Sequence, residues 1–99
     1  MKVLVTNIPN TSKNVCDCCG TWIAHWIKHK KVKPVFCRSC KKKTKDLLGG
    51  HVWKVKDSSD RKWYIVPLCS SCNQTEDKEF CVEETDLVWV RACEKTDHA

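Results

Sequence analysis

Four cysteines carry the clearest chemistry of this sequence, because they occur as two Cys-x-x-Cys pairs. Cys37 and Cys40 form the first pair, Cys69 and Cys72 form the second, and 28 residues separate the two. Each pair can fold as a tight knuckle, and the segment between them is long enough to fold back and bring four thiolates to one zinc ion. The pattern therefore predicts a structural zinc site that anchors the chain.

Further metal-ligating side chains lie upstream of these pairs. They are Cys16, Cys18, Cys19, His25 and His29. Their types allow a second zinc site, which Cys93 could complete, so we expect one zinc ion and leave a second open. However, only five residues separate Cys19 from His25, against about a dozen in a two-Cys two-His finger. The alternative is a set of plain thiols and helix-packing histidines.

The cysteine count also bears on the redox environment. Nine cysteines in 99 residues need an explanation, and disulfides are the alternative to metal binding. The sequence starts without an apolar signal segment, and an odd number of cysteines cannot all pair internally. We therefore expect a reducing, cytoplasmic setting. No run of residues is apolar enough to predict a membrane span.

The two halves of the chain differ in net charge, which is positive in the first half and negative in the second. Residues 1–45 carry eleven Lys and Arg against Asp17 alone, whereas residues 46–99 carry seven against eleven acids. The densest part holds nine cations and no acid: Lys28, Lys30, Lys31, Lys33, Arg38, Lys41, Lys42, Lys43 and Lys45. This basic segment is a candidate for contact with nucleic-acid phosphates. The alternative is an ordinary solvated face, and neutralising Lys41, Lys42 and Lys43 would distinguish the two.

A helix is predicted directly before the basic segment. Thr21 can serve as its N-cap, and Trp22, Ile23, Trp26 and Ile27 recur with the spacing of one apolar stripe. Tryptophans at this spacing are expected in the core rather than on a ligand surface. His25 and His29, four residues apart, share another face of the same helix.

A β-hairpin is predicted between the two cysteine pairs. Gly49 and Gly50 form its tight entry, residues 52–56 its first strand, residues 57–60 its turn and residues 61–66 its second strand, which Pro67 is expected to end.

The remaining segments complete the predicted domain. A helix is expected to start in the second cysteine pair and run to residue 79, and a last strand is expected over 87–92. Residues 1–14 form an extended lead, residues 15–95 a single zinc-binding domain and residues 96–99 a tail. The order of knuckle, hairpin and zinc-ligating helix start predicts a small α+β domain of the treble-clef type, with an added N-terminal helix and C-terminal strand.

Two segments resemble the HNH-like treble-clef family. They are Leu48-Gly49-Gly50-His51-Val52 and Pro67-Leu68-Cys69-Ser70-Ser71-Cys72-Asn73, taken together with Cys37 and Cys40. In active members of that family, the histidine at the position of His51 is a general base that activates water beside a bound metal. The resemblance thus implies a metal-dependent endonuclease as an alternative function.

This chain departs from the active members at three positions. Gly50 stands where an acid usually precedes the histidine, Tyr64 where an asparagine orients it, and Asn73 where a final histidine binds the catalytic metal. Asparagine is a weaker ligand for a divalent ion than imidazole or carboxylate. These departures favour a non-catalytic domain, in which His51 has a structural role.

Most of the chain is also similar to a set of small bacterial proteins of uncharacterised activity. The similarity covers residues 16–92 and rests on a Cys-Gly-[Ser/Thr]-Trp-x-x-His-Trp segment, a Leu-x-Gly-x-His-Val segment and a Trp-Tyr-Ile-Val-Pro-Leu-Cys segment. It implies a shared fold and no particular activity. Three functions follow, in this order: a non-catalytic zinc-binding module that contacts nucleic acid, an HNH-like endonuclease, and a structural or protein-interaction zinc domain.

Overall fold

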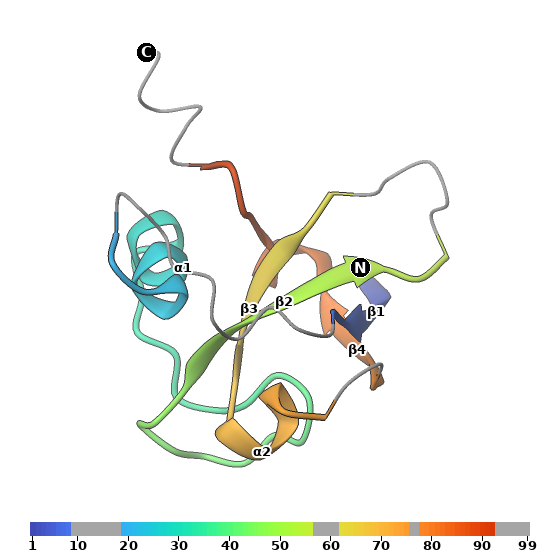
Figure 1. Cartoon of the computed structure of the whole chain (residues 1–99), viewed down its shortest axis with the longest axis horizontal. Helices are drawn as coiled ribbons and strands as arrows, with labels where there is room; N and C mark the ends of the chain where they lie inside the picture. Colours follow the sequence, from blue (N-terminus) through green and yellow to red (C-terminus); the bar gives the residue numbers. More distant parts are fainter. Residues whose placement is uncertain (9–18, 57–61, 76–77, 93–99) are drawn as a thin grey trace.

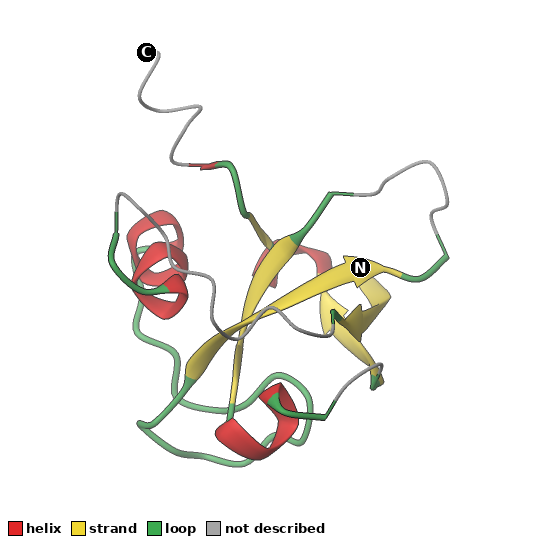
Figure 2. Ribbon diagram, viewed as in Figure 1, coloured by secondary structure: helices red, strands yellow, loops and turns green. Residues whose placement is uncertain are grey.

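The computed structural model describes residues 1–8, 19–56, 62–75 and 78–92. Its elements are β1 (Lys2–Asn7), α1 (Trp22–Lys30), β2 (Leu48–Lys54), β3 (Tyr64–Leu68), α2 (Ser70–Asn73), β4 (Glu79–Glu83), the 3-10 helix η1 (Glu84–Asp86) and β5 (Val88–Trp89). The strands form one antiparallel sheet in the order β4-β1-β2-β3-β5, with α1 beside it and α2 at the end of β3 (Figures 1 and 2). The predicted α+β class is confirmed. Neither α1 nor α2 has the length and apolar character needed to cross a membrane.

The predicted hairpin is present as β2 and β3, which pair with His51 opposite Ile65. The sequence predicts that Pro67 ends the pairing, whereas the ladder continues with Gly49 opposite Pro67. The carbonyl of Pro67 accepts a hydrogen bond from the Arg38 N–H at 2.9 Å, on the side away from β2. The nitrogen and oxygen of one residue point to the same side of a strand, so the missing N–H of proline costs no bond to β2. The predicted turn at residues 57–60 lies outside the described residues.

The N-terminal segment, predicted as an extended lead over residues 1–14, is a strand inside the sheet. β1 pairs with β2 on one side and with β4 on the other. Val5 and Asn7 are buried, so β1 is part of the core. Its extended conformation agrees with the prediction, but its place between two strands does not follow from the local sequence. Residues 9–14 of the predicted lead lie outside the described residues.

The predicted helix is confirmed as α1. The hydroxyl oxygen of Thr21 accepts a hydrogen bond from the Ala24 N–H at 3.2 Å, which caps the helix start. Trp26 is 1% exposed, so it lies in the core as expected. Gly49 allows the helix to approach β2, because a Cβ atom there would lie 2.5 Å from the backbone of Trp22. Gly49 and Gly50 were predicted as the tight entry of the hairpin, but both lie inside β2, and Gly49 instead allows the helix to pack closely.

The helix predicted to run to residue 79 is much shorter, since α2 ends at Asn73 and Glu79 begins β4. The side-chain amide of Asn7 donates to three carbonyl oxygens, those of Cys72 at 3.2 Å, Asn73 at 3.0 Å and Thr75 at 2.8 Å. In a longer helix, carbonyls in these positions would accept from N–H groups one turn further on. Asn7 of β1 thus donates to the carbonyl groups at the end of α2, where the Cys72 carbonyl also accepts from the Thr75 N–H at 3.2 Å. Residues 76–77 lie outside the described residues.

The C-terminal strand is also shorter than predicted. The sequence predicts a strand over 87–92, but β5 contains only Val88 and Trp89, which pair with Ile65 and Tyr64. η1 precedes β5 and turns the chain from one edge of the sheet towards the other. Cys93 and the predicted tail at residues 96–99 lie outside the described residues.

The buried side chains form two groups, one on each face of β3, because successive residues of a strand point to opposite faces. The cysteine-side core comprises Val5, Cys37, Leu47, Val52, Val66, Leu68, Cys69, Cys72, Phe80 and Val82. The helix-side core comprises Trp26, Ile65 and Val88, against which Trp22, Ile23 and Ile27 of α1 pack. The cysteine pairs and α1 therefore stabilise opposite faces of the same sheet.

Candidate metal centre

The first cysteine pair lies in a tight knuckle between α1 and β2. The backbone N–H groups of Ser39 and Cys40 point to the Sγ atom of Cys37, at 3.4 and 3.5 Å. The N–H of Cys37 donates to the carbonyl of Lys42 at 2.9 Å, and Lys41 has a left-handed backbone with φ of 69°. The chain thus doubles back directly after Cys40. Donors aimed at a sulfur stabilise its thiolate form, which is the form that binds metal.

The second pair lies where β3 passes into α2. Cys69 is the N-cap of α2, and its carbonyl accepts from the N–H of Asn73 at 2.9 Å. Cys72 follows almost one helical turn later, so its side chain lies on the same side as that of Cys69. The bond between Arg38 and Pro67 holds the knuckle against the end of β3. Backbone structure alone therefore brings the two pairs together.

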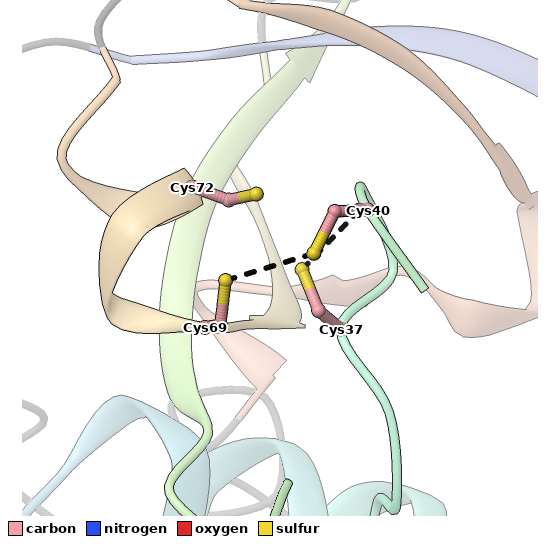
Figure 3. A group of neighbouring side chains, drawn as sticks. All are labelled: Cys37, Cys40, Cys69 and Cys72. Carbon is pink, nitrogen blue, oxygen red and sulfur yellow. Dashed lines mark hydrogen bonds between the residues drawn. The ribbon is translucent and has the colours of Figure 1, made fainter. Parts of the chain in front are cut away.

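The four sulfurs converge on one point, as Figure 3 shows for Cys37, Cys40, Cys69 and Cys72. All four lie within 4.8 Å of one another, and Cys40 Sγ and Cys69 Sγ are 3.8 Å apart. Tetrahedral coordination with metal–sulfur bonds of about 2.3 Å places sulfurs about 3.8 Å apart. The cluster therefore has the donor set and the dimensions for one metal ion.

Ionisation differs between the sulfurs of this cluster. Burial raises the pKa of the Cys37 thiol, but backbone N–H donors from Cys69, Cys40 and Ser39 outweigh it and bring the pKa to about 6. Burial, together with the neighbouring thiols, raises the pKa of Cys72 to about 11. A bound divalent cation favours the thiolate form of every ligand, so metal binding would release protons. Cys72 would have to lose its proton on binding, because its pKa lies well above neutral.

Lys78 is a neighbour of the cluster that the sequence did not single out. Its ammonium group lies 3.6 Å from the Cys72 Sγ atom. Four thiolates around a divalent ion carry a net charge of about −2, which an adjacent cation stabilises. Lys78 directly precedes β4 and lies six residues after Cys72 in the sequence.

Arg38 joins the knuckle to the helix side of the molecule. It is 8% exposed, and its Nε atom donates to the carboxylate of Asp86 at 3.0 Å. Its guanidinium also donates to the Phe36 carbonyl at 2.8 Å and lies over the Phe36 ring. The carbonyl of Asp86 in turn accepts from the Trp26 indole N–H at 2.8 Å. Arg38 therefore does not belong with the exposed cations of the basic segment.

The other cations of that segment lie at the surface. Those with exposed side chains are Lys28, Lys31, Lys33, Lys41, Lys42, Lys43 and Lys45. Lys30 is half-buried, and its ammonium group donates to the carbonyl of Thr85. Lys28 lies in α1, Lys31 and Lys33 follow α1, and the other exposed lysines follow the first cysteine knuckle, so the basic segment and the cysteine cluster are neighbours in the sequence.

The proposed second metal site is only partly within the described residues, because Cys16, Cys18 and Cys93 are outside them. Across the described ranges, the group of three or more potential ligands that lie close enough to share an ion is the four-cysteine cluster. Cys19, His25 and His29 are not part of it. The Nε2 atom of His25 lies 2.9 Å from the Trp89 carbonyl, and the His25 and His29 rings are 4.8 Å apart. The second site stays a prediction.

His51 lies in the middle of β2, facing the helix side. It is 2% exposed, and its ring packs edge-on against Trp22 at 4.9 Å and Trp63 at 6.0 Å. Burial, with a smaller effect of His25, lowers the pKa of His51 to about 4. Among the described residues, its Nε2 atom has no hydrogen-bond partner. The role of His51 as a general base stays a prediction, and this burial does not favour it because such a base must reach water.

Comparison with known proteins gave no matching family model, no matching curated protein and no matching solved structure. The resemblance to the HNH-like treble-clef family therefore stays a prediction. That the four-cysteine cluster could hold a metal ion rests on its geometry alone.

Proposed function

We propose that this chain is a small non-catalytic domain of the HNH-like treble-clef type, stabilised by one zinc ion in the four-cysteine cluster. The observation that carries the proposal is the convergence of four thiols within 4.8 Å, three of them buried. Four sulfur ligands in tetrahedral arrangement suit zinc, which closed four-cysteine sites of proteins commonly hold.

The size of the domain supports a structural role for the ion. A chain of 99 residues has a modest core, and the cysteine-side core contains three of the four ligands. A structural zinc can contribute on the order of 10 kcal/mol to the folding of small domains. The cluster ties three elements together, namely the knuckle, the end of β3 and α2.

We also propose that the exposed lysines of the basic segment contact nucleic-acid phosphates. Lys41, Lys42 and Lys43 follow the knuckle directly and are all exposed, while Arg38 is retained inside the fold. Several lysines on one surface give affinity that is weakly sequence-specific and falls steeply with salt. The zinc ion would hold this surface in place without taking part in the contact.

Native mass spectrometry of protein purified without added metal tests the zinc proposal. We expect one zinc per chain, identified by its mass, and none in a Cys69→Ser, Cys72→Ser variant. Cys81→Ser is the matched control, because Cys81 is exposed on β4 and outside the cluster. Absence of zinc from the parent protein, or its retention in the double variant, would contradict the proposal.

Binding to a DNA duplex at two salt concentrations tests the contact with nucleic acid. Lys42→Gln with Lys43→Gln should weaken binding and reduce its dependence on salt. Lys2→Gln with Lys56→Gln is the control, since it removes the same charge from exposed positions elsewhere. Equal affinity of the two variants would leave the zinc domain with a structural or protein-interaction role. The endonuclease alternative is tested by the same samples, incubated with a divalent ion.

A further inference from the structure

A second surface of the molecule has the chemistry of a binding site. Where the β3–β5 ladder ends, away from the metal centre, lies a cavity of about 440 Å³. It is lined by Lys62, Trp63, Trp89, Val90 and Arg91. Two indoles and two cations thus line one cavity, and the described lining residues include no acid.

The register of the sheet explains why both tryptophans reach this cavity. Trp89 is opposite Tyr64, so Trp63, one residue earlier, belongs to the other face. The carbonyl of Trp63 accepts from the Val90 N–H at 3.0 Å, which holds the two segments side by side at the rim of the sheet. One indole from each face therefore borders the cavity.

The two indoles differ in their surroundings. Trp63 is 37% exposed, although part of its ring packs against His51. The ammonium group of Lys62 lies over the Trp89 ring, 5.1 Å from its centroid. Trp63 is thus the indole that offers a stacking surface, and Trp89 with Lys62 and Arg91 forms a cationic wall beside it.

We infer that this cavity binds an unstacked base of a single-stranded nucleic acid, with the adjoining phosphate at Lys62 and Arg91. Planar bases stack on aromatic rings whatever their sequence, and cations beside the rings follow the backbone. A duplex cannot supply an unstacked base. The inference rests on the proposed contact with nucleic acid. It adds a second contact site and specifies a single strand as the ligand that reaches both the cavity and the basic segment.

The two contact sites are well separated along the molecule. Trp63 precedes β3 and Cys69 follows it, so the five residues of the strand, about 17 Å, lie between the cavity and the metal centre. α1 packs against this strand (Figure 1), and the bond between Arg38 and Pro67 holds the knuckle of the basic segment at its far end. A strand of several nucleotides is therefore needed to reach both sites, whereas a mononucleotide would reach one.

Fluorescence anisotropy of the zinc-loaded full chain with a labelled ten-nucleotide thymidylate strand tests the inference. Trp63→Ala should weaken binding roughly 5- to 100-fold, and Trp63→Phe, which keeps an aromatic ring, should restore most of it. Lys62→Gln with Arg91→Gln, at exposed positions, should also weaken binding. Val32→Ala is the control, because Val32 is exposed and lies outside the cavity.

The outcomes separate this inference from the proposed function. Equal affinities of the Trp63→Ala and Val32→Ala variants, or equal losses in Trp63→Ala and Trp63→Phe, would overturn the inference. Binding of duplex but not of the single strand would also overturn it and would leave the basic-segment contact standing. If thymidine monophosphate bound as tightly as the ten-nucleotide strand, the cavity would be a site for free nucleotides and the inference would be overturned. A loss of affinity in Trp63→Ala, without a loss in the Lys42→Gln, Lys43→Gln variant, would support binding at the cavity and contradict the proposed contact of the basic segment.

Discussion

The two faces of the sheet bury polar groups in opposite ways. On the cysteine side, four thiols face one another at the spacing of a metal site, so a single ion would satisfy all of them. Three buried side-chain atoms have no hydrogen-bond partner among the described residues: Nε2 of His51 and Nε1 of Trp22 on the helix side, and Oγ of Ser39 in the cysteine knuckle. Burying such a group without a partner costs stability. We infer that the cysteine side stabilises the fold and that the helix side is the weaker half.

One ion pair connects the two halves. Arg38 starts in the knuckle, pairs with Asp86 and lies 5.4 Å from the ring centre of Trp26 in α1. Because both partners are largely removed from water, this pair is more than a surface contact. It gives metal binding a route to influence the position of α1. The following predictions test this comparison, beginning with the largest effect.

Metal removal should abolish the fold of both halves. A zinc contribution on the order of 10 kcal/mol is comparable to the whole stability of a typical domain. A strong chelator, or Cys69→Ser with Cys72→Ser, should therefore remove the cooperative thermal transition seen by near-ultraviolet circular dichroism. Cys81→Ser should melt like the parent protein. A helix-side tryptophan signal that survives chelation would show that the two halves fold independently.

Acid should destabilise the helix side through His51. The pKa of His51 is about 4 in the folded chain against 6.5 for the free side chain, so the unfolded chain binds the proton first as the pH falls. Stability is therefore lost between pH 6.5 and pH 4, by about 3 kcal/mol, and levels off below pH 4.

Urea unfolding of His51→Phe across this pH range measures the effect. The variant should lose less stability than the parent protein between pH 6.5 and pH 4, and comparing the two cancels any acid effect on the metal site. The pKa of His29 is also lowered, by burial first and then by His25 and Lys28, so His29→Gln should lose part of the parent's pH dependence but less of it than His51→Phe. Identical pH dependence of parent and His51→Phe would contradict the assignment to His51.

Breaking the connecting ion pair should have a smaller effect. Asp86→Asn leaves the guanidinium of Arg38 buried without its carboxylate, and we expect a loss of about 2 kcal/mol in urea unfolding. Glu84→Gln is the matched control, since the pair of Glu84 with Lys54 is half-exposed and should contribute less than about 1 kcal/mol. Equal effects of the two variants would mean that Arg38 does not connect the halves.

The smallest effect concerns the support of the second cysteine pair. Asn7→Ala removes the amide that ends α2 and should cost about 1 kcal/mol, together with a measurable loss of metal affinity in a competition with a chelator. Gln74→Ala removes an exposed side-chain bond to Ser70 and should change neither quantity. Unchanged metal affinity in Asn7→Ala would show that α2 holds its conformation without β1.

Local features of the fold could be predicted from the sequence because they depend on neighbouring residues. The spacing of Cys37, Cys40, Cys69 and Cys72 predicted the metal cluster, and the four sulfurs do converge. The apolar stripe and the N-cap Thr21 predicted α1, and β-branched residues predicted the hairpin. In each case the signal lies within a few residues, or in a repeated pair with the spacing of metal ligands.

The predictions that were wrong concerned features that depend on contacts between distant segments. The length of α2 is set by Asn7, which is 65 residues from Cys72, and no local signal marks that contact. By contrast, Lys78 is only six residues from Cys72, and no motif in the sequence marked it as a neighbour of the sulfur.

The sequence by itself identified the four cysteines that converge, because metal chemistry restricts both the type and the spacing of candidate ligands. Only the tertiary structure decided that the N-terminal segment lies inside the sheet, that Arg38 points inward while its lysine neighbours point outward, and that Trp63 and Trp89 border one cavity. Strand order and side-chain burial depend on which surfaces pack together across the whole chain. A residue's own neighbours in the sequence do not specify that packing.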